Sequence, residues 1–139
     1  MQSPIHEVRS AIYDLAGVIG ARRSQLPTFG TTEDGARPHV EERDGQLSLV
    51  IVERGEEIER RRARDQDELL YWVFEDVTHL MASDWELGHR VEGQDSRILL
   101  FKKQIELLDR LSRRWSARYR EENGELLRAV GIEGSSNQP

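Results

Sequence analysis

The spacing of apolar residues changes abruptly near Asp65, and this change constrains the fold more than any other feature. Before it, residues 47–53 alternate, with Leu47, Leu49 and Ile51 on one side. After it, apolar residues recur every third or fourth position. Alternation is typical of half-buried strands, and the longer period is typical of amphipathic helices. The order therefore predicts an α+β domain in which a small sheet precedes a helical part.

Residues 38–64 are expected to form a small antiparallel three-stranded sheet. Asp44-Gly45 predicts a tight hairpin, because the glycine readily takes the positive φ that such a turn requires. The run Arg60-Arg61-Arg62 is interpreted as part of a charged edge strand, since acids surround it and no aromatic residues interleave it. The three strands are expected at 39–42, 47–53 and 57–64.

Three to four helices, two of them long, should pack on one face of this sheet. The prediction covers one domain, 1–139, with its parts at 1–23 (N-terminal helix), 38–64 (sheet), 66–128 (helical part) and 133–139 (frayed tail). Within the helical part, a long helix from about 67 to 91 should follow a cap at Asp65 or Asp67. A second long helix should begin after Asp95 or Ser96, and either Ser112 caps a final helix or the second helix continues to about Leu127.

Asp84 lies between Leu80 and Leu87 on the apolar stripe expected for the first long helix. A buried carboxylate must be paired or hydrogen-bonded, so we expect Asp84 to be buried and paired with Arg90 or Arg97. The predicted structural polar network consists of Asp84, Arg90, Arg97 and Gln104. An alternative stays open, in which a polar cleft around Asp84, Arg90 and Arg97 serves a small ligand-binding domain or enzyme.

The net charge of −6 is concentrated in one segment. Residues 1–65 hold 12 acids and 10 bases, residues 66–92 hold seven acids and one base, and residues 93–139 hold seven acids and nine bases. Such a field attracts basic partners and disfavours direct contact with nucleic acid. The acids expected to point outward toward a partner are Glu75, Asp76 and Glu86. Trp85 is either their anchor or a core residue, because tryptophan serves both roles.

The residue patterns offer no catalytic site, metal site or cofactor site. There is no cysteine, and no phosphate-binding glycine loop or nucleophile motif occurs. His79 has acidic neighbours but too few partners for zinc, so no metal is expected. The chain also has no apolar leader and no run of about 18 apolar residues, so we expect a cytoplasmic protein without membrane contact. A structural or chaperone-like interaction protein is a further possibility.

A spread of positions over roughly residues 38–128 resembles the immunity protein 63 family of bacterial polymorphic-toxin systems. No tight catalytic signature is among these positions. They are Glu53-Arg54-Gly55, the segment 67–72 (DELLYW), Asp76, Met81-Ala82, Glu86-Leu87, Arg90, Arg97, Phe101, Gln104 and Trp115.

The resemblance implies a non-catalytic protein that binds one toxin and protects the cell that makes both. It implies a cytosolic inhibitor, comparable to an antitoxin, that acts through protein–protein contact. Many toxins of such systems are nucleases or other enzymes that act on nucleic acid. Combined with the acidic segment, the resemblance leads us to expect a basic toxin, with a nuclease among the candidates.

Overall fold

The computed structural model describes residues 3–33 and 35–132 of the 139-residue chain, so the tail predicted at 133–139 lies outside the described residues. The chain divides into two compact units, Met1–Phe74 and Glu75–Pro139, which are described separately. The α+β class predicted from the sequence is confirmed. That the chain is one domain stays a prediction.

Helix α1 (Pro4–Ile19) supplies one side of the core of the first unit. Its buried residues are Val8, Ile12, Ala16 and Ile19. This face contacts strands β2 and β3. The Ile5 amide, which has no partner within the helix, donates to the Glu42 carboxylate of β2 at 3.0 Å. The helix ends at Ile19, earlier than expected, because Gly20 adopts the left-handed conformation.

The sheet has four strands in the order β1-β2-β3-β4. They are β1 (Thr28–Phe29), β2 (His39–Arg43), β3 (Gln46–Glu53) and β4 (Glu56–Arg62). β2, β3 and β4 pair antiparallel as predicted, but β1 pairs parallel with β2. The expectation of a purely antiparallel three-stranded sheet was therefore wrong in this detail. Two residues are too few to show an alternating pattern, so β1 left no signal in the sequence.

Local chemistry sets the sheet's turns and its outer edge. Asp44 and Gly45 both have positive φ (54° and 80°), as the tight turn between β2 and β3 requires. β4 lies at the edge, as predicted for the arginine-rich run. Arg60 donates to Glu41 at 3.0 Å and to Glu57 at 2.8 Å, so its charge is compensated within the sheet. The edge strand is thus protected by paired charges.

Helix α2 (Gln66–Gly88) begins at the predicted cap Asp65, whose carboxylate accepts a hydrogen bond from the Glu68 amide at 2.9 Å. Its first residues belong to the first unit, where the Arg61 guanidinium stacks over the Trp72 ring at 4.2 Å. Trp72 is buried, which confirms its predicted place in the core.

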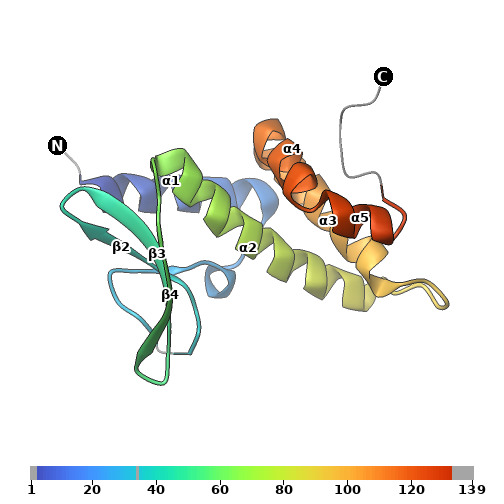
Figure 1. The fold of residues 1–139 in the computed structure, drawn as a ribbon, viewed down its shortest axis with the longest axis horizontal. Helices are drawn as coiled ribbons and strands as arrows, with labels where there is room; N and C mark the ends of the chain where they lie inside the picture. The colour runs from blue at the N-terminus through green and yellow to red at the C-terminus, as the bar shows by residue number, and fades with distance from the viewer. Residues whose placement is uncertain (1–2, 34, 133–139) are drawn as a thin grey trace. The chain divides into compact units, whose positions relative to one another are not determined.

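The second unit is helical, and in Figure 1 α3 lies beside α4. Its helices after α2 are α3 (Ser96–Leu111), α4 (Arg113–Glu122) and α5 (Gly124–Ala129). Asp95 caps α3 and Ser112 caps α4, which decides between the alternatives that the sequence left open at both positions. The described residues hold five α-helices instead of three to four, because the chain breaks at Ser112 and again at Asn123. Trp115 is buried as expected, and Phe101, Leu127 and Val130 form an apolar cluster.

Candidate functional site

The second half of α2 buries small and polar residues and exposes large apolar ones. Thr78, Ala82 and Glu86 are buried, at a spacing of four that places them on one side of the helix. The other side carries Leu80 and Leu87, which are 41% and 65% exposed. Asp76 and Asp84 are also exposed and share that side by helical spacing. We call Asp76, Leu80, Asp84 and Leu87 the outward face.

A polar network explains why this part of α2 is oriented as it is. The Gln104 side-chain amide of α3 donates to the Glu75 carbonyl at 2.9 Å and to the Thr78 hydroxyl at 3.2 Å. The Tyr119 hydroxyl of α4 donates to the Gln104 side-chain oxygen at 2.8 Å. Burial, and secondarily the charge of Glu75, raises the pKa of Tyr119, so its hydroxyl keeps the proton it donates. Polar contacts therefore orient α2 toward α3.

The predicted burial of Asp84 is wrong, because its side chain is exposed. Arg90 instead donates two hydrogen bonds to Glu86, at 2.9 and 3.0 Å, and Arg97 pairs with Asp95 at 2.7 Å. Arg90 and Arg97 therefore each pair with a carboxylate other than that of Asp84. After Val77 the buried side of α2 runs through small and polar positions, so the predicted stripe of large apolar residues was out of phase in this part of the helix.

Gln104 is 1% exposed and belongs to a buried polar network, although its partners differ from those expected. Nothing in the spacing along one helix could identify Tyr119 as its partner, because that residue lies on α4. The sequence showed only that Gln104 is a polar residue on the inward side of an amphipathic helix. Such a residue must find hydrogen-bond partners when it is buried.

The residues predicted to bind a partner differ in their surroundings. Asp76 is exposed and Glu75 is half-buried, but Glu86 is only 4% exposed, so the prediction that it points outward is wrong. Although Asp76 is exposed as a residue, nearby protein atoms reduce solvation of its carboxyl group. This desolvation raises its pKa, and the charge of His79 partly opposes the shift.

Trp85 is half-buried and lies on the side of α2 opposite Asp76, nine positions away. Its ring stacks on His89, with ring centroids 4.1 Å apart, and the Lys103 ammonium of α3 lies 5.1 Å from its centroid. These contacts engage much of the ring within the second unit. The structure therefore does not bring Trp85 together with Asp76 on one surface.

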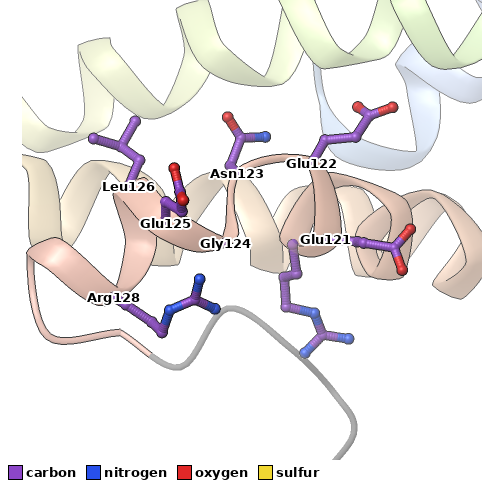
Figure 2. A pocket seen from close by; sticks show the side chains of 8 residues that line it. Glu121, Glu122, Asn123, Gly124, Glu125, Leu126 and Arg128 are labelled. Carbon is purple, nitrogen blue, oxygen red and sulfur yellow. The ribbon is translucent and has the colours of Figure 1, made fainter.

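Four surface hollows can be described, and none of them is lined by Asp84. The hollow at the junction of α4 and α5 has a volume of about 580 Å³ and is lined by residues 120–126 and Arg128. Figure 2 shows the carboxylates of Glu121 and Glu122 directed away from the Arg128 guanidinium. Other hollows, of about 310, 260 and 340 Å³, are likewise lined by residues other than Asp84, Arg90 and Arg97.

Within residues 3–33 and 35–132, no group of three or more histidine, aspartate or glutamate side chains is placed to hold a metal ion. Over the same residues, no helix combines the length and the apolar character needed to cross a membrane. The fold defines a small α+β protein.

Comparison with known families identifies a match. A family model described as immunity protein 63 matches residues 43–125. The match spans more than half of the chain, and the chain belongs to the immunity protein 63 family. Membership points to an immunity protein of a toxin system and implies that the protein binds a cognate toxin. Searches of curated proteins and of solved structures each returned no match.

Proposed function

We propose that this chain neutralises one cognate toxin by direct contact and that the outward face of α2 is the principal contact surface. The observation that carries the proposal is the exposure of Leu80 and Leu87 on the same side as Asp76 and Asp84. A soluble helix normally buries its large apolar residues and exposes its small and polar ones. From Thr78 onward α2 departs from this rule, because Leu80 and Leu87 are exposed while Thr78, Ala82 and Glu86 are buried, and this favours a partner for the exposed side.

The chemistry of this face specifies the partner that would fit it. Leucines spaced about two turns apart fit an apolar groove, as anchors do in helix-in-groove recognition. The carboxylates of Asp76 and Asp84 favour lysine or arginine on the rim of that groove. The partner proposed is therefore a toxin with a basic surface around an apolar groove, and a nuclease is one protein of this kind. Occlusion of the active site or of a neighbouring surface would block its activity.

The alternative of a ligand-binding domain or enzyme with a cleft around Asp84, Arg90 and Arg97 gains no support. Each arginine already pairs with another carboxylate, and the hollows described above lie elsewhere. Cytoplasmic action is part of the proposal, because the protein would have to meet the toxin inside the cell that makes both.

The proposal is tested by capture and rescue. The tagged chain is used to capture proteins from its native host, and each captured protein is then expressed in cells with and without the chain. We expect one captured protein to be toxic and the chain to restore growth. Failure of the chain to restore growth against any toxic protein that it captures would refute toxin neutralisation.

A matched pair of variants tests the surface in the same assay. Leu80→Ser with Leu87→Ser should abolish rescue. Val18→Ser with Ile58→Ser should preserve it, because these residues are 50% and 58% exposed in the first unit and have no place on the outward face. Equal rescue by both variants would place the contact elsewhere. Both proteins should keep the circular dichroism spectrum of the unmodified chain.

A further inference from the structure

A basic, aromatic hollow in the first unit lies outside the segment that matches the family model. Its volume is about 310 Å³, at the lower end of the range for ligand pockets. Arg9 and Tyr13 of α1 line it together with Arg23, Phe29 and Arg37. All of these residues precede residue 43, where the family match begins. The hollow is therefore a feature of this chain that the family match does not account for.

Two arginines of the hollow are held by aromatic rings. The Arg23 guanidinium lies 4.2 Å from the centroid of the Tyr13 ring, and the Arg9 guanidinium lies 5.7 Å from the same centroid. Arg9 also lies 5.8 Å from the Phe29 ring, which meets Tyr13 edge to face. Stacking occupies the flat face of a guanidinium and leaves its N–H groups, which lie in its plane, able to donate.

Neither Arg9 nor Arg23 forms an ion pair with a carboxylate of the described residues. Arg37 differs, because it donates to Glu33 at 3.0 Å, to the Leu26 carbonyl at 2.8 Å and to the Arg23 carbonyl at 2.7 Å. It thus fixes the backbone that carries Arg23. The hollow therefore holds two exposed cations in a defined position, without an internal counterion among the described residues.

The donors that remain in the hollow favour a planar carboxylate over a phosphate. The Leu26 amide donates to Arg23 and the Thr28 amide to Pro38, while Pro27 has no N–H group. The Thr28 hydroxyl donates to Thr31. Phosphate sites commonly add backbone N–H groups to their cations, whereas the planar fork of arginine matches a carboxylate with two parallel hydrogen bonds.

We propose that this hollow binds an acidic side chain of the toxin and gives the complex its specificity. The inference rests on the proposed function, because it assumes a protein partner. The partner would then present basic groups to α2 and a glutamate or aspartate to Arg9 and Arg23. The family match includes α2 but not the hollow. The hollow would therefore allow this chain to select its own toxin over the toxins that other family members bind.

The first test uses the isolated protein and does not depend on the toxin. N-acetyl-glutamyl-glutamate amide is titrated into the labelled chain, and NMR follows the side-chain N–H signals of Arg9 and Arg23 together with the backbone amide signals of Tyr13 and Phe29, which the variants retain. We expect saturable shifts with a dissociation constant on the order of millimolar. Arg9→Gln with Arg23→Gln should weaken this binding about tenfold or more, whereas Arg113→Gln, at an exposed arginine of α4, should not. Absence of shifts at Arg9 and Arg23 would overturn the proposal.

Two further experiments test whether the hollow prefers a carboxylate to a phosphate and whether it contributes to toxin binding. Inorganic phosphate is titrated in the same way, and tighter binding of phosphate than of the dipeptide would overturn the assignment to a carboxylate. Once a toxin has been captured, the double glutamine variant should bind it about tenfold more weakly. Unchanged affinity for the toxin would overturn the role of the hollow in recognition, while rescue by the unmodified chain would leave the proposed function standing.

Discussion

Asp84 and Glu86 are two positions apart on α2 and have opposite surroundings. Asp84 is exposed between two leucines, whereas Glu86 is buried and accepts two hydrogen bonds from Arg90. These hydrogen bonds are also the main reason that the pKa of Glu86 is lowered. A glutamate four positions before an arginine is a recognisable helical pair, so this signal was present in the sequence. The apolar neighbours of Asp84 were the misleading signal.

Tyr119→Phe should destabilise the protein by about 1–2 kcal/mol, because it leaves the buried Gln104 oxygen without its donor. The control is Tyr13→Phe, since the ring of Tyr13 makes the contacts described above and the residue is half-buried. Its effect should stay within about 0.5 kcal/mol. Urea denaturation measures both variants, and equal effects would mean that the Tyr119 hydroxyl contributes nothing specific.

Asp95 should titrate in the folded protein with a pKa of about 2, below its ordinary value of 3.8. The side chain of Arg97 is the main cause, and the Arg97 amide adds to it. A lowered pKa means that the stabilisation is complete above the ordinary value and is lost as the pH falls toward about 2. NMR titration of the carboxyl carbon checks the value. Arg97→Gln should raise this pKa, and an unchanged pKa would contradict the assigned cause.

At the scale of elements, signals confined to a few neighbouring residues were dependable. The cap at Asp95, the cap at Ser112 and the turn at Asp44-Gly45 all depend on contacts within three residues or on local backbone angles. Sequence reasoning found each of them. The N-terminal helix and the hairpin of β2 and β3 followed from the same kind of pattern.

Elements defined by distant partners were not predictable in this way. β1 is a strand only because two residues pair with β2, ten or more positions away. The orientation of α2 depends on Gln104, 29 positions beyond Glu75. The basic hollow likewise joins α1 to residues 23–37, which the sequence indicated only as a loop. Periodicity within one element carries no information about such contacts, so these features required the structure.

Two glycines at the end of α1 should respond to alanine with opposite signs. Gly17 is exposed within the helix and no atom lies within 4 Å of an added Cβ, so Gly17→Ala should stabilise by about 0.5–1 kcal/mol. Gly20 ends the helix at a φ of 77°, so Gly20→Ala should destabilise by about 1 kcal/mol. Thermal unfolding measures both, and equal signs would contradict the position of the helix end.

At the scale of the whole chain, the acidic charge that the composition shows for one segment is also present at the surface of that segment. The segment 66–92 carries seven acids and one base, and α2 accounts for most of it. Two of these acids, Asp76 and Asp84, lie on the outward face, whereas Glu86 is neutralised internally by Arg90. The acidic character predicted from the sequence thus persists at the surface, carried partly by other residues than those expected.

Association with the toxin should slow as salt rises, because the acids of the outward face attract basic groups across solvent. Asp76→Lys with Asp84→Lys should lower the association rate about tenfold at low salt. Asp14→Lys with Glu121→Lys makes the same change in net charge at exposed positions elsewhere and should have a smaller effect. Stopped-flow kinetics measures these rates, and a rate independent of salt would place the interface on an uncharged surface.

The affinity of the captured toxin for the Leu80→Ser, Leu87→Ser variant tests the central claim most directly. Isothermal titration calorimetry would compare it with the Val18→Ser, Ile58→Ser variant, which also removes two exposed apolar side chains. If the outward face is the contact surface, the first variant should bind about 100-fold more weakly, and the second should bind like the unmodified chain. Equal affinities for the two variants would contradict the claim that α2 presents the toxin-binding surface.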